Sequence, residues 1–424
     1  MIPENSNLFK QFDQKRNLYY ICCMVVAIVA GLGYTWSIVQ TPFVQKLGGT
    51  SVTATVALCY TFTVLCSTMS PTILGGLTRH LKINQMILIG GILFGGGYFL
   101  TGYINSIPML FLTYGVGTGV GAGLMYPSIM GYSASVMPEK QGFSSGLMAG
   151  VYGGSAIFWS PLLANMIAGS GLTACFNIIG PVCLVLCIAM SFVVKAVPDG
   201  YVAYKQSQIA GAGGSDGGTG AKPKSHSVYD MDRGHMVRTS LFYVAAFAFA
   251  FGLTSGMMII SQASQILQSG HGMTPTQAAL YVSLLSLMSL IGRILWGSVT
   301  DKMDKYVTLC IICAIPILTM GILTVVTSTG VVIACMAITA LCYGGFGGTI
   351  TPITADLFGT GHITENYGVM YLMFGIAALI GPRVAVTMSH NGDYSKAFLI
   401  GCVLAVISLA AAFVIRRKVA SAQS

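Results

Sequence analysis

Residues 284–300 read LLSLMSLIGRILWGSVT, and this stretch sets the class of fold. It is apolar over nearly the length that an α-helix needs to cross the hydrocarbon core of a bilayer. One residue, Arg293, interrupts it. A guanidinium near the middle of such a span costs roughly 2.5–3.5 kcal/mol on insertion scales, and arginine cannot release its proton to avoid that cost. The stretch therefore predicts a membrane helix that retains a positive charge, which a negative partner must offset.

The composition extends this prediction to the whole chain. Its 424 residues are 54% hydrophobic and 8% charged, whereas a soluble domain carries about 25% charged residues. Apolar runs of about 20 residues span a bilayer as helices. Twelve such runs occur, at 18–40, 53–75, 84–104, 108–133, 143–168, 172–194, 239–264, 276–300, 306–328, 330–354, 364–388 and 394–415. We therefore predict an all-α membrane protein with twelve transmembrane helices.

One long polar stretch, residues 196–238, divides the runs into six and six. It contains AGAGGSDGGTGAKPKSH, a composition typical of flexible linkers. We predict an N-terminal six-helix half at 1–195, a cytoplasmic linker at 196–238 and a C-terminal six-helix half at 239–424. The other loops between the runs are short.

The net charge of +9 follows the membrane topology. If the N-terminus is cytoplasmic, 17 of the 21 Lys and Arg residues fall in cytoplasmic segments. Lys46 and Lys396 fall outside, and Arg293 and Arg383 lie in spans. This bias is the positive-inside rule, which predicts that both termini are cytoplasmic. We expect a multi-pass protein of the inner (plasma) membrane, with no nucleic-acid partner.

The ionisable residues do not support enzyme chemistry. By sequence, all twelve Asp and Glu residues lie in loops or at helix ends, and the six histidines avoid the span centres. Neither a nucleophile with an adjacent base nor a metal-ligand cluster can be drawn, and the lone CxxC at Cys310 and Cys313 lies within an apolar run. We predict that the chain is not an enzyme and needs no metal or cofactor. A proton relay through the membrane also lacks residues, so a coupled proton would travel with the substrate.

Two interpretations fit each membrane arginine. Arg293 lies about seven residues before the loop at Thr300, roughly 10 Å along a helix, so it either extends to the interface or faces a substrate anion. We favour the substrate for Arg293. Arg383 lies near the outer end of its run, where extension to the interface is favoured, with a gating or second-anion role as the alternative.

Aromatic side chains occur in the middle of several runs. Each by itself is more often a packing residue or a lipid anchor than a ligand. Together with one cation they suit a small organic anion, because rings enclose its carbon skeleton while hydroxyls and the guanidinium bind its carboxylate. The aromatic residues are Tyr34, Trp36, Tyr126, Tyr152, Tyr343 and Tyr371.

The turn after residues 276–300 contains Gly297, Asp301 and Lys302. A glycine followed four residues later by an acid and a base indicates either a gate latch that holds helix ends together or a short basic turn. The matching segment in the first half, 75–82, carries Arg79 at the acidic position and is therefore degenerate.

The 6+6 layout resembles the major facilitator superfamily, and several motifs resemble its monocarboxylate transporter and oxalate:formate antiporter branch, in its bacterial form. The resemblance runs over nearly the whole length. It rests on the stretches Gly33-Tyr-Thr-Trp36, Pro138-Glu-Lys-Gln-Gly-Phe-Ser-Ser-Gly146, Met236-Val-Arg-Thr-Ser-Leu-Phe242, Gly292-Arg293-Ile-Leu-Trp-Gly297, Asp356-Leu-Phe-Gly359 and Asn366-Tyr-Gly368.

The resemblance implies a binding site. Arg293 matches the arginine that binds the substrate carboxylate. Tyr34, Tyr126 and Tyr152 match tyrosines of the oxalate carrier's cavity, whereas Tyr343 and Tyr371 stand where that carrier has tryptophans. The carrier's second cation, a lysine, is replaced by Phe374, and its span 10 tyrosine by Gly347. In the animal carriers, an aspartate stands at the position of Ser289 and an acidic residue near that of Gly31.

These differences predict the substrate. A dianion facing Arg293 alone would keep one charge uncompensated, whereas a monoanion would not, and Phe374 suits a short alkyl group. We expect a transporter of lactate- or pyruvate-like monocarboxylates, working by proton symport with alternating access. The alternative is an oxalate:formate-type antiporter that recruits Arg383. A non-transporting sensor and a sugar or drug facilitator have less support. The expected partners are a small carboxylate, a proton and the lipid bilayer, and we expect a monomer.

Overall fold

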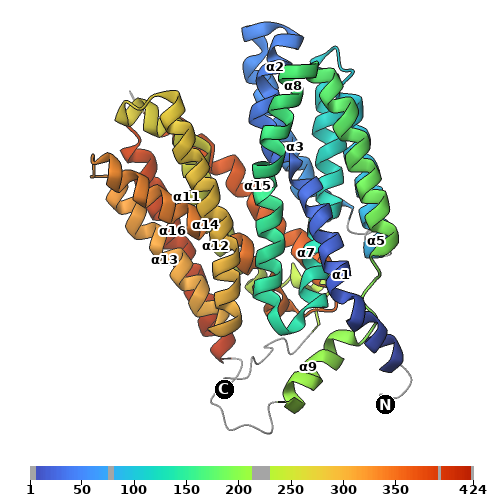
Figure 1. Ribbon diagram of the computed structural model, residues 1–424. Coiled ribbons are helices and arrows are strands. Elements are labelled where there is room, and N and C mark those ends of the chain that lie inside the picture. The colour runs from blue at the N-terminus through green and yellow to red at the C-terminus, as the bar shows by residue number, and fades with distance from the viewer. Residues whose placement is uncertain (1–5, 75–80, 213–229, 390–392, 422–424) are drawn as a thin grey trace. The chain divides into compact units, whose positions relative to one another are not determined.

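The computed structural model describes residues 6–74, 81–212, 230–389 and 393–421, which form helices and turns without a β-strand among them (Figure 1). Two compact units emerge. The first comprises residues 1–139 and 151–222, and the second comprises 140–150 and 223–424. The first ten residues of helix α8 therefore group with the second unit, while the rest of that helix groups with the first.

The described part of the first unit consists of long helices joined by short helical segments. They are α1 (Ser6–Ala30), η1 (Gly31–Thr35), α2 (Trp36–Leu47), α3 (Thr53–Ile73), α5 (Ile83–Thr101), α6 (Ile107–Leu110), the π-helix Phe111–Thr118, α7 (Gly119–Val136), α8 (Gln141–Val193, whose start belongs to the second unit) and α9 (Tyr201–Ala212). Glycines allow α7 to pack closely on α3, since a Cβ on Gly119 would lie 2.7 Å from the carbonyl oxygen of Thr63.

The second unit contains six long helices and the short α10 (Arg233–Met236). They are α11 (Ser240–His271), α12 (Pro275–Lys302), α13 (Lys305–Leu323), α14 (Thr329–Phe358), α15 (Ile363–Met388) and α16 (Ser395–Ser421). Their limits follow ordinary capping chemistry. A capping box of Thr274 and Gln277 starts α12, and α11 ends at Gly272, which has a left-handed conformation with φ of 66°.

Ten stretches of the described residues are long and apolar enough to cross a membrane. One of them, Pro138–Val193, joins two helices at Gly171, whose φ of 85° departs from helical geometry. The 21-residue helix α3 is not among the ten. The all-helical membrane class is thus confirmed, and twelve crossings remain a prediction.

Several helix limits differ from the sequence prediction. Helix α1 begins at Ser6, well before residue 18, and breaks at Gly31, so Tyr34 lies in a 3-10 segment. Helix α12 continues to Lys302, which places Arg293 nine positions before its end. The predicted linker holds α9 at its start and α10 near its end, while residues 213–229 lie outside the described part. Polar sequence alone did not reveal that the linker ends are helical.

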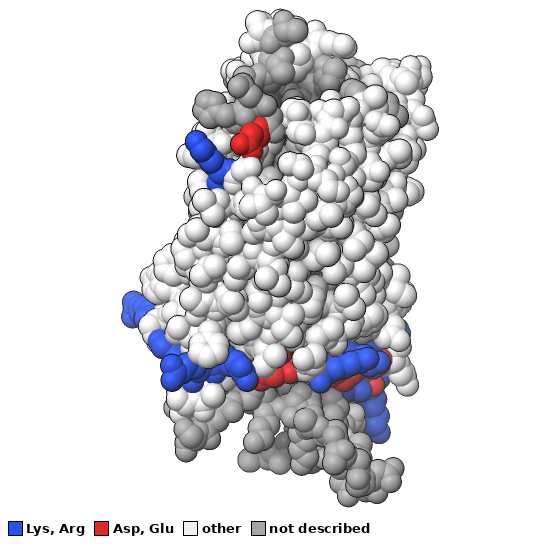
Figure 2. All heavy atoms as spheres, turned by 90° about the vertical axis from the view of Figure 1, so that its left-hand side faces the viewer, with Lys and Arg blue, Asp and Glu red and all other residues white. Residues whose placement is uncertain are grey.

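Basic residues of the second unit gather at one end. Helices α13 and α16 are antiparallel, because Cys313 contacts Ser408 at 3.1 Å and Cys402 contacts the Ile317 carbonyl at 3.5 Å. This register sets Lys305 level with the basic run 416–418. Figure 2 shows one side of the molecule. Charged side chains form a band near its lower end, and the long surface above that band is almost without charge. The pattern is that of a membrane-embedded surface with one basic edge.

Candidate functional site

Arg293 lies inside the second unit rather than at its surface. Its side chain is 5% exposed, and Nη1 donates a hydrogen bond to the carbonyl oxygen of Ala149, 2.5 Å away in the early part of α8. On the α14 side, a Cβ built on Gly347 would lie 3.6 Å from both Cγ and Nε of Arg293. The guanidinium is therefore held among α8, α12 and α14, and it does not extend to the interface.

Glycines fix the backbone around Arg293. A Cβ on Gly146 of α8 or on Gly348 of α14 would clash with the carbonyl oxygen of Arg293 itself. One turn away, a Cβ on Gly344 would clash with the carbonyl of Ser289. Helix α12 is therefore in backbone contact with two neighbours at the level of its arginine. The glycines at these positions therefore serve close helix packing.

Three of the predicted aromatic residues form one cluster in the second unit. The rings of Tyr343 and Phe374 have centroids 6.4 Å apart at 77°, and those of Tyr371 and Phe374 are 5.6 Å apart. Tyr343 and Tyr371 are buried, and Phe374 is half-buried. Tyr343 and Gly347 are four residues apart on α14 and share one face, so this cluster and Arg293 adjoin the same face of that helix.

The other three tyrosines form a second cluster, in the first unit. Tyr126 and Tyr152 stack with centroids 3.8 Å apart, and Tyr34 meets Tyr152 edge-on at 5.3 Å. Tyr34 is 38% exposed, whereas the other two are buried. Trp36 is different, because its ring packs on Phe43, Tyr60 and Tyr114 in the core of this unit.

Two positions where the animal carriers have acidic residues are neutral here, and the structure explains one of them. A Cβ on Gly31 would clash with the hydroxyl of Ser155 and the carbonyl of Tyr152, so no acidic side chain fits. Ser289 precedes Arg293 by one turn of α12 and is 7% exposed. Its hydroxyl stands where the resemblance implies a carboxylate in the animal carriers.

The loop motif has a defined structural role. Asp301 caps the N-terminus of α8, since its Oδ1 accepts from Gly142 N at 2.8 Å and its Oδ2 from Phe143 N at 2.7 Å. A carboxylate at this place also faces the positive end of the helix dipole. Gly297 allows the same approach, because a Cβ there would clash with the Gly142 carbonyl. Lys302 is exposed. Most of the matching segment, residues 75–80, lies outside the described part.

The remaining charges lie at helix ends or surfaces. Arg383 of α15 is exposed, as expected for a side chain that extends to the interface. Asp356, in the last turn of α14, accepts hydrogen bonds from Tyr306 and from Lys305 Nζ at 3.1 Å. In the first unit, Asp13 pairs with Lys205 at 2.8 Å. Among the described residues, no group of three His, Cys, Asp or Glu side chains could hold a metal ion.

Sequence reasoning missed the Ala149 carbonyl. A backbone acceptor leaves no trace in residue identity, and only the packing of α8 on α12 brings it to Arg293. The Pro138–Gly146 motif was an indirect signal, since its glycines make that packing possible. The other site residues found from sequence divide into two clusters, one in each unit.

Residues 21–382 of the chain match the family model of the Major Facilitator Superfamily, and residues 244–424 match it a second time. Among curated proteins, the oxalate:formate antiporter of Oxalobacter formigenes is 25% identical over 400 residues, covering 94% of this chain and 90% of that protein. An uncharacterized MFS-type transporter of Escherichia coli, YhjX, is 26% identical over 386 residues and covers 89% of this chain and 88% of its own. Human monocarboxylate transporter 12 is 22% identical over 383 residues, covering 85% and 72%.

Solved structures show the same fold at lower identity. The fucose:proton symporter FucP of E. coli superposes with a TM-score of 0.69 at 12% identity, covering 95% of this chain and 99% of that one. The human organic anion transporter MFSD10 gives a TM-score of 0.70 at 11% identity, covering 94% and 99%. The fold and the branch inferred from the sequence motifs are thereby confirmed.

Proposed function

The chain belongs to the major facilitator superfamily, whose members are transporters rather than enzymes, and on that premise we propose that it carries short monocarboxylates together with protons. Its relatives include carriers named for oxalate and formate and for monocarboxylates. Carriage of small organic anions is the broad activity that these names support. The choice of monoanions and of symport rests on this chain's own residues.

The observation that carries the proposal is the buried position of Arg293. A guanidinium that is 5% exposed stays charged, and burial of a charge is costly unless an opposite charge offsets it. Nη1 donates one hydrogen bond to the carbonyl oxygen of Ala149. We propose that a substrate carboxylate binds the planar fork of the guanidinium, which can donate two parallel hydrogen bonds to it.

The aromatic cluster of Tyr343, Tyr371 and Phe374 favours a monoanion. Two opposite charges 4 Å apart attract by about 4 kcal/mol at an effective dielectric of 20. A dianion needs a second such pair, but Phe374 offers it an apolar ring between two tyrosines. A methyl or short alkyl group gains from the same ring. The tyrosines of the first unit, Tyr34, Tyr126 and Tyr152, enter the proposal through the resemblance alone.

The scarcity of titratable groups in the spans bears on the route that a coupled proton would take. The twelve carboxylates lie in loops or near helix ends by sequence, so the protein itself has few groups that could relay a proton across. We propose that the proton crosses with the anion. The cap that Asp301 forms on α8 would act as the gate latch, because it joins the ends of α8 and α12 only while the two helices are in contact.

The decisive experiment measures uptake of labelled lactate into proteoliposomes, with and without an inward proton gradient, and with oxalate as competitor. We expect uptake to rise with the gradient and to be insensitive to oxalate. Arg293→Gln should abolish it, whereas Arg383→Gln, the matched removal of an exposed charge, should preserve it. Intact uptake in Arg293→Gln would overturn the binding site, and absence of lactate uptake in the wild type would overturn the substrate class.

The oxalate:formate antiporter relative supports exchange as the second candidate. Exchange predicts lactate or formate uptake only with a counter-anion inside the vesicle, and strong competition by oxalate. It also requires a second cation. Arg383 is the other span arginine, so its substitution should then abolish dianion transport while monoanion transport survives.

A further inference from the structure

The second unit contains a cavity away from Arg293, at the opposite end from its basic edge. Its volume is about 320 Å³, near the lower limit of small-molecule pockets. It lies where α11 ends, where α13 passes into α14, and where α16 begins. Its polar lining residues include Asp393, His271, Ser269, Thr327 and Ser395.

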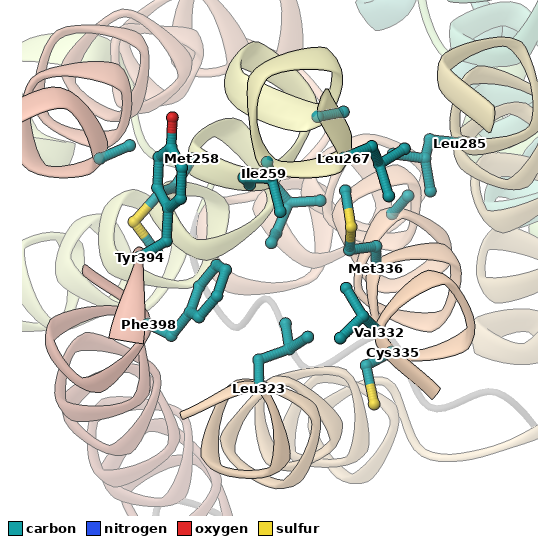
Figure 3. Close-up of a cluster of buried hydrophobic side chains, with 14 of the residues drawn as sticks. Met258, Ile259, Leu267, Leu285, Leu323, Val332, Cys335, Met336, Tyr394 and Phe398 are labelled. Carbon is teal, nitrogen blue, oxygen red and sulfur yellow. The ribbon is translucent and has the colours of Figure 1, made fainter. Parts of the chain in front are cut away.

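The floor of the cavity is apolar. Leu323, Val332 and Phe398 line it and also belong to a buried hydrophobic cluster of this unit. Figure 3 shows these three side chains converging from α13, α14 and α16, with Tyr394 next to Phe398. Such a floor suits a hydrocarbon chain rather than a fully hydrated solute.

One charged residue, Asp393, lines the cavity, and the basic Lys396 lies close enough to act on its carboxylate although it is not part of the lining. Asp393 accepts a hydrogen bond from Ser395 N at 2.8 Å, and hydrogen bonds from Ser395 hold the pKa of this carboxyl below its ordinary value, with a smaller contribution from the nearby Lys396. Both charged residues are exposed. His271 lies on the rim too, with Nδ1 3.3 Å from the Thr329 hydroxyl. An anion and a cation side by side complement a zwitterion.

The position of the cavity along the helices matches the headgroup layer of a bilayer. Lys396 and Arg416 are 20 positions apart on α16, about 30 Å at the helical rise, which is the thickness of the hydrocarbon core. When the basic run 416–418 lies at one membrane interface, Asp393 and Lys396 therefore lie at the opposite interface. Nearby large apolar side chains point outward, with Val325 79% and Leu399 57% exposed. The cavity therefore borders a lipid-facing surface.

We propose that this cavity binds a zwitterionic aminophospholipid, with its ammonium at Asp393, its phosphate toward Lys396 and the start of one acyl chain on Leu323, Val332 and Phe398. A primary ammonium donates charge-assisted hydrogen bonds to a carboxylate, whereas the quaternary ammonium of choline has no N–H to donate. The site thus distinguishes ethanolamine from choline headgroups. The proposal is independent of the substrate carried at Arg293.

The test is native mass spectrometry of the purified full-length protein, titrated with phosphatidylethanolamine or phosphatidylcholine of identical chains. We expect the wild type to bind the ethanolamine lipid at least fivefold more tightly. Asp393→Asn should reduce this preference below twofold, while Asp199→Asn, an exposed carboxylate of the first unit, leaves it unchanged. Equal binding of both lipids by the wild type would overturn the proposal, as would an unchanged preference in Asp393→Asn.

Two further measurements identify the contacts and the source of the headgroup. Lys396→Gln should weaken binding of both lipids severalfold without changing their ratio, because both carry the phosphate, and Lys195→Gln is its control. Glycerophosphoethanolamine, which lacks acyl chains, should not displace the lipid at millimolar concentration. Displacement at that concentration would show that the apolar floor contributes nothing and would contradict a lipid occupant. Thermal melting of each variant verifies that it is folded.

Discussion

Arg293 and Arg383 are the two arginines that the sequence places within spans of the second unit. In the structure, one is buried and the other is exposed. Arg293 on α12 is 5% exposed and hydrogen-bonds a backbone carbonyl of α8, whereas Arg383 on α15 is exposed. Hydropathy assigns both to apolar runs. Whether such a charge is buried depends on which helix face contacts a neighbour, and glycines at positions 146 and 348 let α8 and α14 approach the backbone of α12 at Arg293.

The largest expected effect is a difference in lactate uptake between variants of Arg293 and of Arg383. Arg293→Gln should lower the kcat/KM of lactate uptake at least 100-fold, because loss of an ion pair worth about 4 kcal/mol exceeds two factors of ten. Arg293→Lys should recover part of the activity, since it keeps the charge but not the planar fork. Arg383→Gln should change uptake less than about twofold. Equal losses in both variants would show that burial does not distinguish the two residues.

The next prediction concerns the backbone contacts that hold Arg293. Gly348→Ala should lower the free energy of unfolding by about 1–3 kcal/mol, since its Cβ would clash with the Arg293 carbonyl. Its neighbour Gly347→Ala should have almost no effect on stability, because there the new Cβ meets Arg293 at an ordinary 3.6 Å. Melting of the purified proteins measures both. A stable Gly348→Ala protein would mean that α12 and α14 separate without cost.

A third prediction tests whether the presence of a single cation in the site explains the expected selectivity for lactate over oxalate. Phe374→Lys would add a second positive charge next to Tyr343 and Tyr371, so lactate uptake should fall about tenfold while oxalate becomes an effective competitor. Each tenfold change corresponds to about 1.4 kcal/mol. Phe374→Leu is the matched control and should retain lactate selectivity, as it keeps the apolar wall. Oxalate competition that is unchanged in the lysine variant would argue against a role for this position in selectivity.

The smallest effect is expected at the α8 cap, on the same helix pair that holds Arg293. Asp301→Ala removes both acceptors for Gly142 N and Phe143 N and should cost about 0.5–2 kcal/mol of stability. Lys302→Ala, one residue later and exposed, should cost less than about 0.5 kcal/mol. Thermal melting compares the two. If Lys302→Ala were the more destabilising, the motif would act as a basic turn rather than as a cap.

The residues that the resemblance assigned to one site form two separate ring clusters in the structure. Tyr34, Tyr126 and Tyr152 make one, and Tyr343, Tyr371 and Phe374 make the other. Their role in substrate binding stays a prediction. The position of Tyr34 in a 3-10 segment was not predicted, because the break at Gly31 arises from packing against Ser155 and Tyr152. Trp36 was grouped with the cavity aromatics but packs in a core, and its sequence neighbourhood contains no signal of that difference.

The sequence by itself determined the membrane class, the helical content and the scarcity of charge in the spans, because each depends on composition and on the 20-residue length that a bilayer demands. Its motifs carried the resemblance to the family. Only the tertiary structure decided that Arg293 meets the Ala149 carbonyl, that Asp301 caps α8, and that α13, α14 and α16 leave a cavity beside Asp393. Those contacts join residues up to 159 positions apart. They depend on which helix faces pack together. Glycine spacing suggests these faces, but only the packed structure specifies them.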